Sequence, residues 1–169
     1  MLLTQQKFYL ASQYLKPLAS VIKDGFEQYV RREKAKHLSA RNLAMAHAMK
    51  YAVKGDYPEL YVDPAFILLS DGSVQGIKVE DIMLENDALR LDFDGGEITP
   101  LNHDDELLLV AYDPIAGVAI RNEMLVTRSS SGLRLELPDY MKNVRLDVFV
   151  LVRDRNRNRY SRSQYAGNV

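Results

Sequence analysis

The spacing of apolar residues changes at Gly55-Asp56-Tyr57-Pro58. Before this segment, apolar residues recur every three or four positions, which is typical of an amphipathic helix. After it they alternate with polar residues, which is typical of strands with one buried face. The change predicts an α+β protein in two parts: a helical arm over residues 1–57 and a β-sandwich domain over residues 58–169.

The helical arm is expected to contain two to three helices. Thr4 is a candidate N-cap for the first, and Pro17 predicts either a kink or a second helix that has Pro17 in its first turn. Ser39 is a candidate N-cap for a further helix, expected to run to Lys54 and to end at Gly55 in the left-handed conformation. The basic tract at residues 31–37 is interpreted as a solvated helix end in preference to a nucleic-acid contact, because no aromatic residues separate its cations.

An apolar stripe runs along the first helices. It consists of Phe8, Ala11, Leu15, Leu18, Ile22, Phe26 and Tyr29. A continuous apolar surface of this kind, if the folded chain leaves it exposed, marks an interface. We therefore predict that Phe8, Leu15, Ile22 and Phe26 contact a protein partner or a second copy of the chain.

The second part shows about seven short alternating segments separated by turn signals, which predicts an antiparallel immunoglobulin-like or fibronectin type III-like sandwich. The first strand is expected at residues 65–69 and the last at 159–166. Residues 106–112 are apolar on both faces, so we expect a central strand there. The sequence has no cysteine and no tryptophan, which excludes the disulfide and the buried tryptophan of an antibody domain.

Charge is distributed in blocks although the net charge is only −1. Residues 1–70 carry +4, residues 71–113 carry −10 and residues 114–169 carry +5. Strands that lie close together could pair these blocks within one chain, which is the interpretation we favour. The alternative is a bipolar surface that orders head-to-tail assembly.

The acidic block contains the only candidates for a metal site. Asp92, Asp94 and Glu97 are weak calcium candidates beside a Gly-Gly turn, and residues 104–106 could add oxygen ligands. Calcium requires about six to eight converging oxygens, and the EF-hand spacing is absent, so a solvated turn explains these residues better. The serines at 129–131 and His103 lie in no recognisable catalytic pattern. We expect no cofactor and no catalytic residues.

Arginine recurs at every second position near the C-terminus, at Arg153, Arg155, Arg157 and Arg159. A turn within residues 154–158 is expected to break this array. The side chains could bind an acidic partner, since guanidinium groups recognise carboxylates and phosphates by paired hydrogen bonds. The structural alternative, which we favour, is protection of an exposed hairpin against edge-to-edge aggregation.

No apolar run approaches the roughly 18 residues of a membrane span. Residues 1–7 lack the basic start and apolar core of a signal peptide, so we expect a cytoplasmic protein or a component of an assembled particle.

Five segments occur in a recognisable order: LTQQKFYLASQYLKPLASVIKDGFEQY, SARNLAMAHAMKYAVKGDYPELYVDPAFILLSDGSV, DDELLLVAYDP, LRLELP and YSRSQYAG. Together they resemble an uncharacterised bacterial family, a domain of unknown function found mainly in Bacteroidetes. The chain departs from that family in lacking a Gly-rich segment before Leu3 and an aromatic residue, often tryptophan, near Phe93. The resemblance implies helices followed by a sandwich, and it implies no activity, ligand or catalytic residue.

These features favour a non-enzymatic interaction or assembly protein that binds a protein partner or associates with itself. The alternative is a sandwich that binds a carbohydrate or another small ligand, with calcium assistance from the acidic residues. A hydrolytic sandwich is the least favoured version of that alternative, because paired catalytic carboxylates need a cleft of fixed width.

Overall fold

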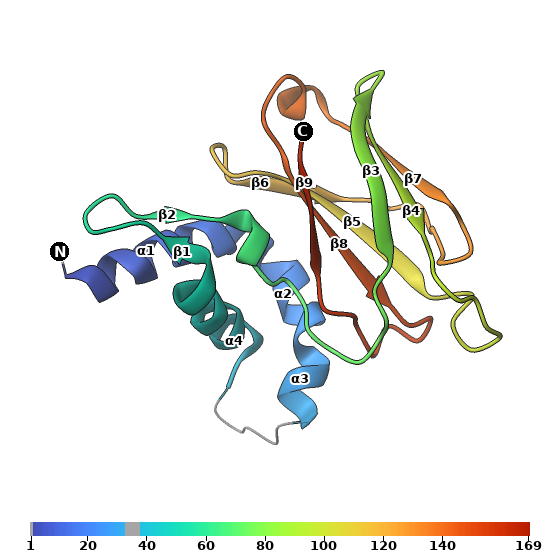
Figure 1. Ribbon diagram of the computed structural model, residues 1–169, viewed down its shortest axis with the longest axis horizontal. Coiled ribbons are helices and arrows are strands. Elements are labelled where there is room, and N and C mark those ends of the chain that lie inside the picture. Colours follow the sequence, from blue (N-terminus) through green and yellow to red (C-terminus); the bar gives the residue numbers. More distant parts are fainter. Residues whose placement is uncertain (1, 33–37) are drawn as a thin grey trace.

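Helices form the first part of the chain and antiparallel strands form the rest, so the protein is α+β, as the change in apolar spacing predicts (Figure 1). The structure is a computed structural model, and it describes residues 2–32 and 38–169. The helical elements are α1 (Leu3–Leu15), the 3-10 turn η1 (Lys16–Leu18), α2 (Ala19–Gly25), α3 (Glu27–Arg32), α4 (Ala40–His47) and the π-helix η2 (Ala48–Ala52).

The strands of the described residues form three antiparallel sheets. They are β1 (Val53–Lys54), β2 (Tyr61–Val62), β3 (Lys78–Glu85), β4 (Ala88–Asp94), β5 (Glu106–Asp113), β6 (Val118–Arg121), β7 (Gly132–Glu136), β8 (Asp147–Arg153) and β9 (Gln164–Asn168), with 3-10 turns η3 (Pro64–Phe66) and η4 (Asp139–Met141). β1 and β2 pair in a small hairpin. The larger sheets have the orders β3-β4-β7 and β6-β5-β8-β9.

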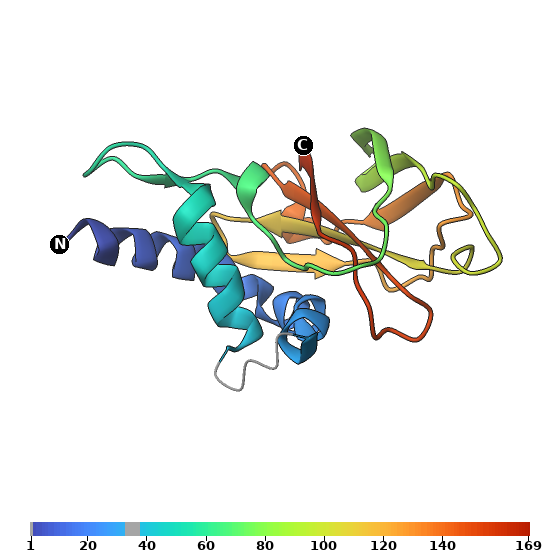
Figure 2. The same ribbon diagram turned by 60° about the horizontal axis from the view of Figure 1, so that its bottom comes forward.

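The strands β5 and β8 lie between two apolar cores. On one face, Val148 and Val150 pack with residues of the three-stranded sheet. On the other face, Tyr112, Phe149 and Leu151 pack with the helices. Both strands are therefore buried on two sides, which confirms the central strand predicted from residues 106–112. Figure 2 shows the helices against one side of the four-stranded sheet.

The ends of the helices follow the sequence signals in part. Ser39 caps α4, because its Oγ accepts a hydrogen bond from the Asn42 backbone N–H at 3.1 Å. Pro17 lies in η1 between two helices, where its missing N–H is tolerated. The expected N-cap at Thr4 is wrong, since α1 already begins at Leu3. Residues 33–37 of the basic tract lie outside the described residues.

The helix expected from Ser39 to Lys54 changes its winding before it ends. It becomes the π-helix η2 at Ala48, and its last two predicted residues form β1. Gly55 follows with φ of +90°, so it has the left-handed conformation that was predicted. It comes after β1, however, and does not end the helix. The chain therefore leaves the helices through a hairpin.

The strand expected at residues 65–69 is absent. Asp63 caps the 3-10 turn η3 instead, and its Oδ1 accepts the Ala65 N–H at 3.1 Å. The backbone N–H of Leu69 then donates to Ser163 Oγ at 2.8 Å, so this segment pairs with a side chain and not with a strand. The strand β3 was not predicted, and the final strand begins later than expected, at Gln164.

Within the described residues, no helix combines the length and the hydropathy that a bilayer span requires.

Candidate interaction surface

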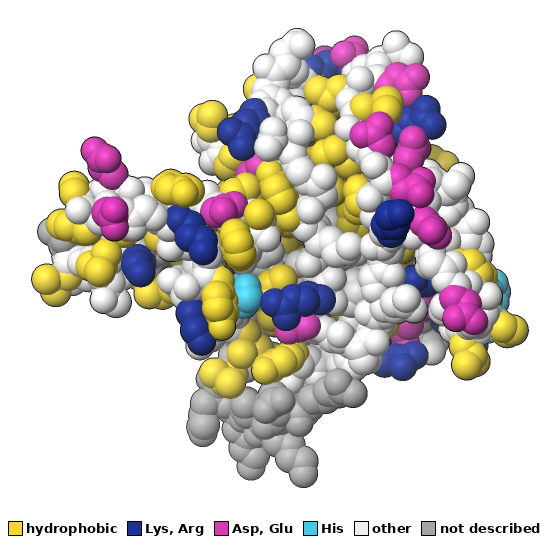
Figure 3. Space-filling model, viewed as in Figure 1, with side chains coloured by type: hydrophobic (Ala, Val, Ile, Leu, Met, Phe, Trp, Pro, Cys, Tyr) yellow, Lys and Arg dark blue, Asp and Glu magenta, His cyan; other side chains and the backbone are white. Residues whose placement is uncertain are grey.

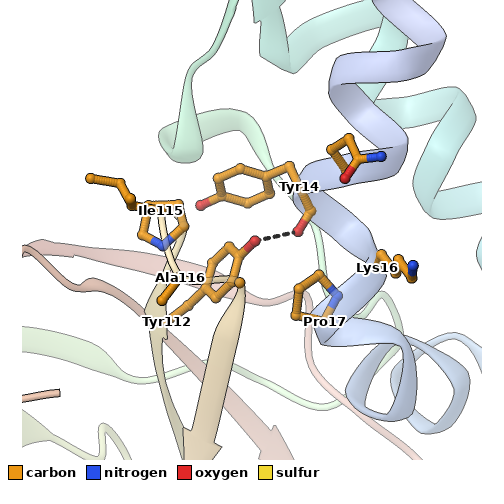
Figure 4. A pocket seen from close by; sticks show the side chains of 9 residues that line it. Tyr14, Lys16, Pro17, Tyr112, Ile115 and Ala116 are labelled. Atoms are coloured by element: carbon orange, nitrogen blue, oxygen red, sulfur yellow. Dashed lines mark hydrogen bonds between the residues drawn. The ribbon is translucent and has the colours of Figure 1, made fainter. Parts of the chain in front are cut away.

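A buried tyrosine fixes the C-terminal end of α1 to the four-stranded sheet (Figure 4). The Tyr14 hydroxyl donates a hydrogen bond to Asp147 Oδ2 on β8 at 2.8 Å. The Tyr112 hydroxyl on β5 donates to the Tyr14 carbonyl at 2.8 Å, and the two rings meet edge to face with centroids 5.0 Å apart. Tyr165 on β9 donates to Asp147 Oδ1 at 3.2 Å. Two strands of one sheet, β5 and β8, thus hold α1 directly, and β9 holds the acceptor Asp147.

The hydroxyl groups of this network have raised pKa values and stay protonated at neutral pH. Burial, and then the negative charge of Asp147, raises the pKa of Tyr14 far above its usual value. Burial raises the pKa of Tyr112 to about 12 and also raises the pKa of Tyr165. Because each hydroxyl already donates to an acceptor inside the protein, none is poised to serve as a nucleophile or proton donor. The network is an anchor.

A hollow of about 620 Å³ opens beside this anchor, between the end of α1 and the turn that joins β5 to β6 (Figure 4). Its walls consist of Gln13, Tyr14, Lys16, Pro17, Tyr112, Pro114, Ile115, Ala116 and Gly117. Ile115, on the turn, is 93% exposed. The hollow therefore combines an exposed apolar side chain with the rigid anchor of α1.

Two elements extend away from the sandwich at the N-terminal side of the molecule, as Figures 1 and 2 both show. We call them the projection, and define it as residues 2–9 of the chain together with residues 53–62, which contain the β1–β2 hairpin. Gln6 joins the two parts, since its Nε2 donates to the Pro58 carbonyl at 2.6 Å.

Large apolar and aromatic side chains cover the projection, and Figure 3 shows hydrophobic groups gathered there. Their exposed fractions lie between 47% and 72%, for Leu2, Leu3, Phe8, Tyr9, Tyr57 and Tyr61. Apolar residues scattered singly on a surface are ordinary, but a contiguous group on an extended element marks an interaction site. The projection is the candidate interaction surface.

The predicted apolar stripe divides into an exposed and a buried part. Leu15, Ile22 and Phe26 are only 2–4% exposed, because they pack in the core between the helices and the four-stranded sheet. Their assignment to an external interface is therefore corrected: the chain covers these three side chains itself. Phe8 lies in the projection and is 55% exposed.

The four arginines predicted to bind a partner lie in or beside the turn between β8 and β9, and each of them meets a carboxylate of its own chain. The ion pairs are Arg153–Glu106 at 2.7 Å, Arg157–Glu106 at 3.3 Å, Arg155–Asp104 at 3.3 Å and Arg159–Asp154 at 3.3 Å. Asp154 Oδ1 also accepts the backbone N–H groups of Asn158 and Arg159 at 2.8 and 3.0 Å, and this turn breaks the array as expected. Binding of a partner by these arginines stays a prediction.

The charged blocks of the sequence meet within one chain. Cations of residues 114–169 pair with carboxylates of residues 71–113 in Arg128–Asp105, Lys142–Asp87, Arg153–Glu106, Arg155–Asp104, Arg157–Glu106 and Arg162–Asp71. This agrees with the interpretation that the charge pattern favoured. Most of these pairs are exposed on at least one side, so each contributes little to stability.

Two of the three weak calcium candidates, Asp92 and Asp94, accept hydrogen bonds within the fold. Asp92 accepts a hydrogen bond from Arg90 Nε at 3.0 Å, and Asp94 Oδ1 accepts the Gly96 backbone N–H at 2.8 Å. In the described part of the chain, no group of three or more His, Asp or Glu side chains is placed to hold a metal ion. Asp92, Asp94 and Glu97 thus do not form a common site.

Sequence reasoning missed the most buried cation of the described residues, Arg128, which is 1% exposed. Its Nη2 and Nε reach Asp105 Oδ2 at 3.1 and 3.3 Å. Its other hydrogen bonds go to the carbonyls of Gln75, Gly76 and Gly95. Burial raises the pKa of Asp105, while the Arg128 guanidinium opposes that rise. One isolated arginine in a loop gives no sequence signal for such a role.

The chain belongs to a family whose function is unknown: residues 3–167 match the model of "Family of unknown function (DUF6266)". No curated protein matches the sequence. No solved structure matches it either.

Proposed function

We propose that the protein is a non-enzymatic interaction or assembly module, and that the projection is its contact surface. The observation that carries this proposal is the set of half-exposed apolar and aromatic side chains on an element that extends from the sandwich. The anchor at Tyr14 supports it, because a contact surface on a rigid mount loses little conformational entropy when a partner binds.

The chemistry of the anchor supports binding over catalysis. Tyr14 and Tyr112 are the most strongly perturbed titratable groups beside the hollow, and perturbed groups in a cleft are the usual candidates for catalytic residues. Here the perturbation raises the pKa of hydroxyl groups that already donate to Asp147 and to a carbonyl. These groups stay neutral and occupied at neutral pH.

We further infer that the sandwich is a fibronectin type III-like relative of the immunoglobulin fold. What supports this is the seven-strand arrangement β3-β4-β7 against β6-β5-β8-β9. In a constant-type immunoglobulin domain the fourth strand lies on the sheet of the first two. Here the fourth strand, β6, lies beside β5 on the other sheet. Sandwiches of this class serve in many proteins as scaffolds for binding surfaces.

The proposal is tested with the double variant Phe8→Ser/Tyr61→Ser, which removes two exposed rings from the projection. The matched control is Leu101→Ser/Tyr140→Ser, at positions that are 92% and 63% exposed and lie outside the projection. Sedimentation velocity over a wide range of protein concentrations measures self-association. Chemical crosslinking in a lysate of the source cells, followed by mass spectrometry, measures contact with other proteins.

We expect the natural chain and the control variant to give the same oligomer or the same crosslinked partner, and the projection variant to lose it. All three proteins should keep the same thermal unfolding midpoint, because the changed side chains are exposed. A natural chain that stays monomeric and whose crosslinks are unchanged in the projection variant overturns the proposal.

A further inference from the structure

A second cavity, of about 500 Å³, lies where the helices meet the edge of the four-stranded sheet. His47 and Tyr51 line it from α4 and η2, Phe66 from η3, and Arg162 and Tyr165 from the start of β9 and the segment before it. We call this cavity the cationic cleft. It is separate from the hollow beside α1, which the β5–β6 turn borders.

The walls of the cationic cleft are partly aromatic, and ammonium groups lie against two of the aromatic rings. Tyr51 and Phe66 are 42% and 46% exposed. Lys50 Nζ lies 4.9 Å from the centroid of the Tyr51 ring, and Lys54 Nζ lies 4.2 Å from that of Phe66. In Figure 3, Lys and Arg side chains alternate with hydrophobic ones where the helices meet the sheet. An anionic ligand would meet positive charge on several sides.

Arg162 supplies hydrogen-bond donors at the cleft. Its side chain is 60% exposed, and its ion pair with Asp71 spans 3.7 Å, which is longer than a hydrogen bond. The Arg162 guanidinium is thus not hydrogen-bonded to Asp71, and it can donate paired hydrogen bonds to two oxygens of one anion. The acidic groups near the cleft include Asp71, which pairs with Arg162, Asp63, which caps η3, and Asp147, which accepts a hydrogen bond from Tyr165.

The backbone that presents Tyr51 is itself unusual. Residues Ala48–Ala52 form a π-helix, a geometry that is rare in proteins and often occurs at functional sites. It places the His47 and Tyr51 rings 4.7 Å apart. Burial, and then the charge of Arg162, lowers the pKa of His47, so the imidazole is neutral at neutral pH and can accept or donate a hydrogen bond.

We propose that the cationic cleft binds a small molecule that carries a carboxylate or phosphate group on a flat apolar body. Arg162 would hold the anionic group, with Lys50 and Lys54 adding positive charge. Tyr51 and Phe66 would contact the flat body. This site does not depend on the projection, so either proposal can fail without the other.

The test uses the full chain labelled with nitrogen-15 and four probes followed by shifts of backbone amide signals. Benzoate and phenyl phosphate carry both features of the proposed ligand and distinguish a carboxylate from a phosphate. Benzamide keeps the flat ring but lacks the charge, and inorganic phosphate keeps the charge but lacks the ring. The variant is Arg162→Gln, and its matched control is Arg121→Gln, at an exposed arginine on β6, at the opposite edge of the sheet from β9.

We expect benzoate or phenyl phosphate to shift signals of residues 47–54, 64–68 and 162–165 in a saturable way. Benzamide and inorganic phosphate should bind at least about tenfold more weakly, and Arg162→Gln should weaken the better anion by about tenfold, since it removes a charge-assisted hydrogen bond. Arg121→Gln should leave binding unchanged.

Three results would each overturn the site: no saturable shift with any probe, equal binding of benzamide and benzoate, or unchanged binding in Arg162→Gln. Equal weakening by Arg121→Gln would also overturn it, because the attraction would then come from the overall charge of the surface. Thermal unfolding of both variants checks that the fold is intact.

Discussion

At the scale of single residues, two buried polar groups connect parts of the chain that are distant in sequence. Asp147 accepts hydrogen bonds from Tyr14 and Tyr165, which lie on a helix and on an edge strand. Arg128 donates hydrogen bonds to Asp105 and to three loop carbonyls. A buried charge without such partners costs several kcal/mol, so both groups make the arrangement of their neighbours specific.

Replacing Tyr14 with phenylalanine removes one donor and leaves the packing almost unchanged. We expect Tyr14→Phe to lower the free energy of unfolding by about 2 kcal/mol, since the charged acceptor Asp147 loses the hydrogen bond that Tyr14 donates. Urea denaturation measures this change. The control Tyr140→Phe, at a residue that is 63% exposed, should change it by less than about 0.5 kcal/mol. Equal effects of the two substitutions would contradict the role of the anchor.

The anchor also makes stability sensitive to alkaline pH. Burial raises the pKa of Tyr112 to about 12 and that of Tyr14 further, whereas both titrate near 10 in the unfolded chain. The stabilisation is complete below about pH 10 and is lost as the pH rises toward the folded pKa, because the unfolded state releases its protons first. Each tyrosine should lower the free energy of unfolding by roughly 1.4 kcal/mol for each pH unit above pH 10, until the pH reaches its pKa in the folded chain.

Urea denaturation at a series of pH values between neutral and about 11.5 tests this expectation. In Tyr14→Phe the slope of unfolding free energy against pH should be shallower by roughly 1.4 kcal/mol per unit. A slope that is the same in the natural chain and in the variant would show that Tyr14 ionises normally.

At the scale of elements, the apolar pattern predicted strands whose environment is uniform along their length. β5 is buried at every position, and its run of apolar residues indicates this directly. β3 escaped prediction because its register shifts between Val79 and Asp81, which interrupts the alternation of its side chains. The composition of residues 65–69 is typical of a strand, but Pro64 and the capping Asp63 start the 3-10 turn η3 there instead.

The candidate sites follow the same logic. Of the exposed projection only Phe8 was predicted, as part of a longer stripe, because the periodicity shows which face of a helix is apolar but not where the supporting sheet ends. The cationic cleft could not be predicted, since it joins residues near 47–54, 64–68 and 162–165 through tertiary packing. The arginine array was visible in the sequence, but the carboxylate partners of Arg153, Arg155 and Arg157 lie about fifty residues away.

The packing of α2 against the segment after η3 depends on one glycine. A Cβ on Gly25 would lie 2.3 Å from the Leu69 carbonyl oxygen and 2.6 Å from Ser70 Cβ, which no packed structure tolerates. We expect Gly25→Ala to lower the free energy of unfolding by about 2 kcal/mol or more. In the control Gly132→Ala the nearest atom would be 3.3 Å away, on the Asp92 side chain, and the loss should stay below about 1 kcal/mol. Denaturant midpoints distinguish the two.

At the scale of the whole molecule, the helices and the four-stranded sheet share one apolar core. The core on the helical side contains Tyr112, Phe149 and Leu151 of the sheet as well as Leu15 and Ile22 of the helices. The predicted boundary between residues 57 and 58 falls inside the β1–β2 hairpin, and the parts on its two sides share buried surface. Removing one part exposes an apolar face of the other.

We expect the full chain to unfold in one transition, with helical circular dichroism and tyrosine fluorescence changing together. A fragment of residues 58–169 should bind a hydrophobic dye and show no cooperative unfolding, because the helix-facing side of β5 and β8 is uncovered. A fragment that unfolds cooperatively at the same temperature as the full chain would instead show that residues 58–169 form an independent domain.

The contacts of Tyr14 also determine how a pulling force on the projection would be transmitted to the sheet. A load applied to the projection passes along α1 and enters the protein at β5 and β8, through Tyr112 and Asp147. Each of these strands is hydrogen-bonded on both sides, so the load spreads across the four-stranded sheet and does not peel away an edge strand. We therefore expect a force on the projection to reach the centre of the sheet through Tyr14, together with the packing of α1 on α4 and η2.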